Sequence, residues 1–101
     1  MIYCSVKKNP YEIKVEGHAD FARLGKDIVC ASVSTAIILS ANLIKRFDQE
    51  KNVEIKISEG YFHLKVKTLS KEIEAVCENL VWTMKELEKT YPNNIKYQEE
   101  R

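Results

Sequence analysis

Apolar and polar residues alternate in the first part of the chain, with the two-residue period that is typical of half-buried strands. The alternation covers residues 2–7 and resumes over residues 11–17. Between the two segments stands Lys8-Asn9-Pro10, which has the composition of a turn. The pattern therefore predicts an N-terminal β-hairpin.

A second pair of alternating segments lies in the middle of the chain. Apolar side chains occupy every second position over residues 53–57 and again over residues 62–66. A short connection that contains Glu59-Gly60 separates the two segments, and such dipeptides are typical of tight turns. This arrangement predicts a second β-hairpin.

The segment from Ile28 to Phe47 predicts a long helix. It contains no Gly or Pro and no charged residue before Lys45. Asp27 directly precedes it and is a candidate N-cap. Apolar side chains occupy most of the circumference of this helix, so we expect it to be covered on more than one side, by the sheet and by either the other helix or a second subunit.

A second helix is predicted from Ser70 to the residues before Pro92. Ile95–Tyr97 beyond it can add a short strand at the edge of the sheet. The apolar residues of the helix recur at spacings of three and four, which places them on one face. They are Ile73, Val76, Cys77, Leu80, Val81, Met84 and Leu87.

The predicted order of elements is ββαββα, with a short C-terminal strand as a further element. Strands that are grouped in hairpins and covered by two helices are typical of an α+β domain with a mostly antiparallel sheet. The chain has 101 residues, of which 45% are hydrophobic and 31% charged, and we interpret residues 1–101 as one domain.

Composition and charge exclude several classes of protein. Sixteen basic residues balance fifteen acidic ones without a basic block, so we expect no direct contact with nucleic acid. No uninterrupted apolar run reaches about 18 residues, and the N-terminus lacks the apolar segment of a signal peptide, so we expect no membrane association. With three cysteines, an odd number, we expect thiols in a reducing cytoplasm rather than disulfides.

The three cysteines differ in their surroundings. Cys4 alternates with apolar strand residues and Cys77 lies in the apolar face of the second helix, so both are expected in the core. Cys30 falls in the first turn of the long helix, where the helix dipole and unpaired N–H groups lower the pKa of a thiol. Backbone amides near Cys30 are also placed to bind an oxyanion, as in acyl transfer.

A thiolate nucleophile needs a partner that moves protons, and the chain has two histidines. His63 lies on the polar side of its strand and is expected at the surface. His18 ends the second strand, and the connection from it leads to the Cys30 helix, so the two side chains can meet. A polar strand end is the other interpretation of His18, and the residues alone leave both open. Neither Cys30 nor His18 has the spacing of a metal site, and we expect no metal and no cofactor.

Two blocks with a fixed separation carry a resemblance to a known family. Gly17-His18-Ala19 is followed by Asp27-Ile28-Val29-Cys30-Ala31, and then by Val33 and Ser34. These blocks, together with the chain length and the order of elements, resemble the ribosomal-processing cysteine proteases, the Prp family.

The resemblance implies a catalytic pair of His18 and Cys30, with Asp27 and Ser34 as supporting residues. It also implies a substrate, the N-terminal extension of the large-subunit ribosomal protein numbered twenty-seven, which family members remove by cutting after an aromatic residue. Members are typically homodimers. The implied mechanism is acyl transfer, in which the Cys30 thiolate attacks the scissile carbonyl and His18 moves the protons.

Two other functions remain compatible with the sequence. One is a catalytically silent module that binds a ribosomal protein or the ribosome. The other is a structural dimer domain in which Cys30 is buried. Dimerisation itself is also expected from the residues, because Trp82 falls outside the apolar face of its helix and the long helix is apolar on several sides. The competing interpretation is that the two helices simply cover each other.

Overall fold

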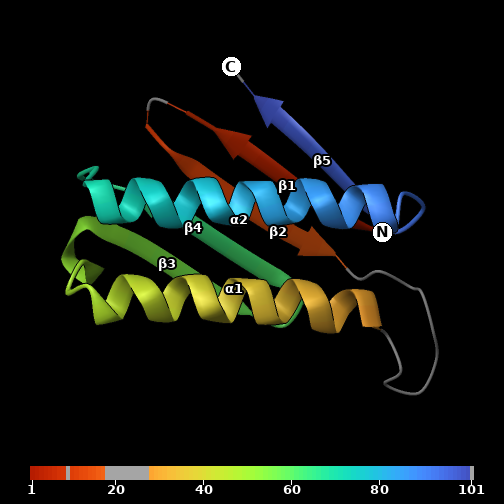
Figure 1. Ribbon diagram of the computed structural model, residues 1–101, viewed down its shortest axis with the longest axis horizontal. Helices are drawn as coiled ribbons and strands as arrows, with labels where there is room; N and C mark the ends of the chain where they lie inside the picture. Colours follow the sequence, from red (N-terminus) through yellow and green to blue (C-terminus); the bar gives the residue numbers. More distant parts are fainter. Residues whose placement is uncertain (9, 18–27, 101) are drawn as a thin grey trace.

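Five strands form one sheet, and two helices lie side by side on one of its faces (Figure 1). The computed structural model describes residues 1–8, 10–17 and 28–100. The strands are β1 (Ile2–Lys7), β2 (Glu12–Gly17), β3 (Val53–Ser58), β4 (Tyr61–Val66) and β5 (Ile95–Glu100). The helices are α1 (Ile28–Arg46) and α2 (Lys71–Thr90), with a short 3-10 turn η1 (Glu50–Asn52) before β3.

The sheet joins the two predicted hairpins through their inner strands. Its order is β3-β4-β2-β1-β5, and every pair is antiparallel except β1 with β5. Strand β2 lies beside β4, so that Val15 is opposite Phe62. The predicted α+β class with a mostly antiparallel sheet is confirmed, since the same fold is found in solved structures.

The C-terminal strand is longer than the sequence predicts. The expected strand ended at Tyr97, whereas β5 continues to Glu100 and runs parallel to β1 at the edge of the sheet. The carboxylate of Glu88 on α2 holds it in place, because its Oε2 accepts the backbone N–H of Tyr97 at 2.9 Å. Lys85 adds to this contact with its Nζ 5.1 Å from the centre of the Tyr97 ring.

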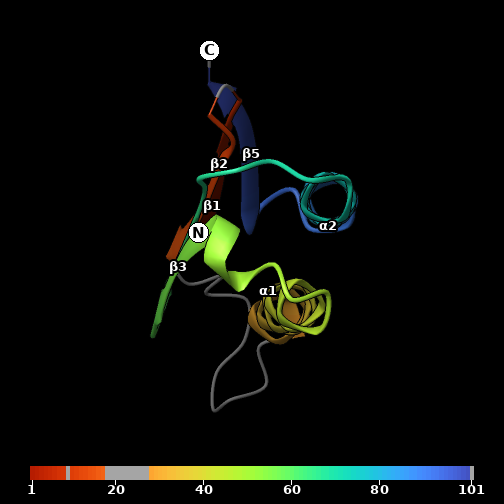
Figure 2. The same ribbon diagram turned by 90° about the vertical axis from the view of Figure 1, so that its left-hand side faces the viewer.

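The core lies between the sheet and the helix layer, which Figure 2 shows edge-on. Alternate strand residues point toward the helices and are buried, as Ile13, Val15 and Leu64 are. Helix α2 begins at the predicted cap, where the Ser70 hydroxyl oxygen accepts the N–H of Ile73 at 3.2 Å. The predicted apolar face of α2 is buried as far as Met84.

Helix α1 buries one side and exposes another. Val29, Val33, Ile37 and Ile44 are buried against the rest of the molecule. By length and composition alone α1 could cross a membrane, since it has 19 residues and a mean hydropathy of 1.7. Because its buried face completes the core, we interpret it as a core helix. Its large exposed apolar side chains are Ile28, Ile38, Leu39 and Leu43.

Candidate active site

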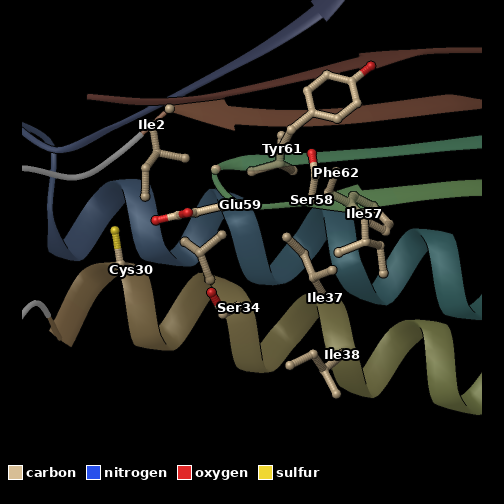
Figure 3. A pocket seen from close by; sticks show the side chains of 14 residues that line it. Ile2, Cys30, Ser34, Ile37, Ile38, Ile57, Ser58, Glu59, Tyr61 and Phe62 are labelled. Carbon is tan, nitrogen blue, oxygen red and sulfur yellow. The ribbon is translucent and has the colours of Figure 1, made fainter. Parts of the chain in front are cut away.

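A pocket of about 290 Å³ opens between the first half of α1, the β3–β4 turn and the end of β2 (Figure 3). Most of its walls are apolar. The polar groups are few and come from the start of α1 and from the hairpin turn. The lining residues are Ile2, Val15, Gly17, Cys30, Val33, Ser34, Ile37, Ile38, Ile57, Ser58, Glu59, Gly60, Tyr61 and Phe62.

Cys30 is the sulfur-bearing residue of this pocket. It is the third residue of α1, in the helical first turn that the sequence predicts, and it is half-buried. Figure 3 shows its Sγ pointing from α1 toward the sheet side of the pocket. Ser34 follows one turn later and lines the same pocket, so the two side chains share one face of the helix.

The other two thiols are remote from solvent. Cys4 is 1% exposed and Cys77 is fully buried, which confirms that both belong to the core. Burial raises the pKa of the Cys4 thiol to about 12, and Glu88 adds to the increase. Burial likewise raises the pKa of Cys77 to about 12, with a smaller contribution from Glu78. Neither thiol is a nucleophile at neutral pH.

The end of β2 is attached to the pocket by its backbone. The Gly17 N–H donates to the carbonyl oxygen of Gly60 in the β3–β4 turn at 3.0 Å. Gly17 has a φ of +105°, and a Cβ at this position would overlap the carbonyl oxygen of Met1. Glycine is therefore required here on two grounds. The strand end that precedes His18 is thus held against the pocket wall.

Two of the predicted site residues, His18 and Asp27, lie outside the described residues, as does the connection between them. The structure therefore leaves the pairing of His18 with Cys30 and the capping role of Asp27 as predictions. It does bring Cys30 and Ser34 together with Gly17, the residue before His18.

His63 lies on the face of the sheet that is turned away from the helices. Its neighbours Phe62 and Leu64 are buried in the core, so the side chain between them points to the other side. There its Nε2 is 3.4 Å from Oε2 of Glu12, and the side chain is 22% exposed. The predicted polar face is correct, although His63 is more covered than a solvated residue because it packs beside β2.

Sequence reasoning missed the contribution of the β3–β4 turn. Glu59 and Gly60 were expected to do no more than reverse the chain, yet both line the pocket beside Cys30. The hairpin pattern contains no signal for this, because it does not specify that β4 pairs with β2.

A second hollow, of about 440 Å³, lies near the β1–β2 turn and the start of α2. Its lining residues, as far as the structure describes them, include no Cys, His or Ser. Within the described ranges, no three His, Cys, Asp or Glu side chains are grouped so that they could bind a metal ion. The pocket at Cys30 is therefore the candidate active site.

Comparisons with known proteins point to the same chemistry. The model of the family described as "Cysteine protease Prp" matches residues 1–96. The ribosomal processing cysteine protease Prp of Staphylococcus aureus is 29% identical over 87 residues, which cover 84% of this chain and 82% of that protein.

Solved structures support the fold. A crystal structure of the essential ribosomal processing protease Prp from S. aureus, with a covalently linked product peptide, has a TM-score of 0.88 and 25% identity. It covers 99% of this chain and 100% of that one. A second crystal structure from S. aureus, with a substrate peptide, has a TM-score of 0.78 and 21% identity over 99% and 100% of the two chains.

Proposed function

This chain belongs to the cysteine protease Prp family, and we propose that it removes the N-terminal extension of the large-subunit ribosomal protein numbered twenty-seven by cutting after an aromatic residue. That it is a cysteine protease of the ribosomal processing type follows from the family match and the curated relative. The observation that carries the finer proposal is the position of Cys30, the one cysteine that opens onto an apolar pocket.

We assign the nucleophile to Cys30 because the chemistry needs a thiolate that a peptide can reach. Cys4 and Cys77 are buried, and their pKa values are raised by that burial. Cys30 is half-buried at the start of α1. In the S. aureus protein a product peptide is covalently linked, as a nucleophilic mechanism requires.

His18 is the proton carrier in this proposal. The only other histidine, His63, is on the opposite face of the sheet and lies beside Glu12. His18 directly follows Gly17, whose N–H is bonded to the pocket wall. A catalytic His must come within hydrogen-bond distance of the nucleophile, and the proposal is supported by Gly17, the residue before His18, which lines the same pocket as Cys30.

The reaction would proceed by acyl transfer. His18 takes the thiol proton, and the Cys30 Sγ forms a bond to the scissile carbonyl carbon. Backbone N–H groups at the start of α1 stabilise the resulting oxyanion. The peptide C–N bond then breaks as His18 returns the proton to the leaving amine, which gives a thioester. Water hydrolyses the thioester and restores the thiol. No cofactor enters these steps.

The walls of the pocket support cleavage next to an aromatic residue. Ile37, Ile57 and Phe62 present apolar surface within reach of Cys30 in the same pocket. An aromatic side chain buries a large apolar area in such a site, and this binding energy orients the peptide for attack.

We also propose that the protein acts in the cytoplasm as a homodimer. Cytoplasmic action follows from a ribosomal substrate. The homodimer is supported by large apolar side chains that the monomer leaves exposed, among them Leu39 at 58% and Trp82 at 61%. Large apolar side chains that a monomer leaves exposed are often covered at an interface.

Cleavage of a peptide that spans the extension, followed by mass spectrometry, tests the proposal. The parent protein is expected to release two fragments that meet directly after the aromatic residue, and Cys30→Ala to release none. Cys77→Ala is the matched control: it makes the same substitution at a core cysteine and is expected to retain activity. Circular dichroism establishes that both variants fold. Turnover by Cys30→Ala, or an intact peptide with the parent, would contradict the proposal.

A further inference from the structure

Glu59 is the only acidic or basic side chain among the described residues that line the pocket. It belongs to the turn between β3 and β4. Figure 3 shows its carboxylate extending from this turn on the side of the pocket where Ile2 and Cys30 lie. The neighbouring wall residues are mainly apolar. The described lining of the pocket thus carries one negative charge, on the side where the candidate nucleophile lies.

The turn that bears Glu59 is held firmly. Ser58 pairs with Tyr61 at the end of the hairpin, and Gly60 takes the left-handed conformation with a φ of +68°. The carbonyl oxygen of Gly60 also accepts the N–H of Gly17 at 3.0 Å, which ties the turn to β2. These contacts hold the backbone of Glu59 at the edge of the pocket.

A carboxylate at an apolar wall attracts cations and repels anions more strongly than one in open solvent, because fewer polar groups screen it. Glu59 is exposed to solvent, so the effect is expected to be moderate. Among the described residues that line the pocket, none carries a positive charge, so a cationic group on a bound peptide is a candidate partner for this carboxylate. Ribosomal proteins neutralise RNA phosphates with lysine and arginine, so a substrate from that class carries many cationic groups.

We propose that Glu59 determines specificity by selecting peptides with a lysine or arginine close to the scissile bond. The inference rests on the proposed peptidase function and adds a charge requirement to the apolar one. Glu59 takes no part in the bond-breaking steps. It raises the affinity for peptides whose basic side chain reaches the β3–β4 turn while the scissile carbonyl lies at Cys30.

The first test measures the local charge without any cleavage. Cys30 is modified with two thiosulfonate reagents of similar size, one with a trimethylammonium group and one with a sulfonate, and the ratio of the rates is determined. The parent is expected to prefer the cation. Glu59→Gln should lower this ratio about fivefold, as expected for a partly exposed charge. Glu59→Lys should invert the preference, so that the anionic reagent reacts faster.

Glu16→Gln is the matched control. Glu16 is an exposed residue of β2 next to Gly17, and it lies on the other face of the sheet because its neighbour Val15 points into the core. The Glu16→Gln substitution also removes one negative charge, at the end of β2 next to the pocket residue Gly17. An equal ratio of rates in the parent, Glu59→Gln and Glu16→Gln would overturn the inference.

The second test uses cleavage of paired peptides that carry either lysine or norleucine at one of the three positions on each side of the cut. At the position that reaches Glu59, kcat/KM for the lysine peptide should fall about fivefold in Glu59→Gln, and that for norleucine should change less than twofold. Equal effects on both peptides at every position would overturn the inference. If the parent cleaves no peptide, the peptidase proposal fails, and the reagent ratio still decides whether Glu59 selects cations.

Discussion

The three cysteines show how position sets the chemistry of one residue type. Cys4 and Cys77 point into the core, where burial favours the neutral thiol, whereas Cys30 lies at a helix start beside a pocket. Local pattern was sufficient to separate them. A cysteine within an apolar periodic face is expected in the core, and a cysteine in the first turn of a helix is expected near unpaired N–H groups.

The buried thiols make stability sensitive to alkaline pH. In the folded protein the pKa of each is raised from 9.0 to about 12. Above pH 9 the unfolded chain therefore releases protons that the folded one retains, so the free energy of unfolding falls as pH rises toward 12. We expect a loss of about 1 kcal/mol per buried thiol between pH 9 and 10.

Urea titrations at these two pH values measure the effect. Cys77→Ala removes one of the two thiols, and its unfolding free energy should fall by about 1 kcal/mol less than that of the parent over the same interval. An identical pH dependence in both proteins would contradict the role of Cys77.

The two supporting residues of the site are expected to respond differently to truncation. As a helix N-cap, Asp27 would accept an N–H in the first turn of α1, so Asp27→Ala should cost about 1 kcal/mol of stability. Turnover should fall too, since a cap would fix the helix start that carries Cys30, and in the proposed mechanism the Asp27 carboxylate would also steady the His18 imidazolium. The unfolding free energy of Ser34→Ala should stay within about 1 kcal/mol of the parent's, because a single hydroxyl contributes little net stability.

Unfolding midpoints and cleavage rates of the two variants decide between these expectations. An Asp27→Ala protein as stable and active as the parent would show that both roles are wrong.

At the scale of elements, periodicity identified both hairpins and both helices, because each buries one face and so must repeat apolar residues at its own period. The pairing of β2 with β4 and the parallel position of β5 were not predictable in this way. A two-residue period specifies which side chains of a strand are buried, but it does not determine which strand pairs with it. The length of β5 was underestimated because its last residues, Gln98 to Glu100, are polar and exposed.

Gly17 offers a test of how the end of β2 positions the site. Gly17→Ala places a Cβ against the Met1 carbonyl at a φ of +105°, which side chains rarely tolerate. We expect a loss of about 2 kcal/mol in unfolding free energy, within the range for strained backbone. Cleavage should fall further than stability explains, since His18 is the next residue.

Gly60→Asn is the comparison for this variant. Gly60 has a φ of +68°, a conformation that asparagine accepts at small cost, so we expect a loss below about 1 kcal/mol. Thermal unfolding together with kcat on the same peptide separates the two effects. Equal stability of Gly17→Ala and the parent would show that the strand end adapts.

At the scale of the whole molecule, α1 presents exposed apolar side chains that lie one turn apart at Leu39 and Leu43. If this face joins two copies, a double substitution to Glu should separate them, because charges buried without partners are strongly unfavourable. Sedimentation at micromolar concentration is expected to show a dimer for the parent and an 11.7 kDa monomer for Leu39→Glu/Leu43→Glu.

Asn93→Glu, in the exposed turn after α2, adds one negative charge away from that face and should leave the dimer intact. A parent that sediments as a monomer would contradict the proposed homodimer. A double variant that remains dimeric would instead place the interface elsewhere.

The site as a whole was predictable only for residues with a linear signature. Cys30 and Ser34 belong to one helical turn, so their shared face follows from spacing alone. Glu59 and Ile57 reach the pocket through the packing of one hairpin against another, and no spacing encodes that. The pocket walls at Ile57 and Glu59 are thus harder to predict from the sequence than the neighbouring positions of Cys30 and Ser34 on one helical turn.

The parallel pairing of β1 with β5 has a consequence for how the chain folds. Ile2 pairs with Ile95, so β1 acquires its neighbour on this side only after the other three strands and both helices have been synthesised. Contacts between such distant residues carry a large loop-closure entropy and slow the folding of a domain. The two hairpins and helices can form from nearer contacts, so we expect β5 to dock last, where the Glu88 carboxylate accepts the Tyr97 N–H. During synthesis, one edge of β1 therefore stays open to any other extended strand until β5 has left the ribosome.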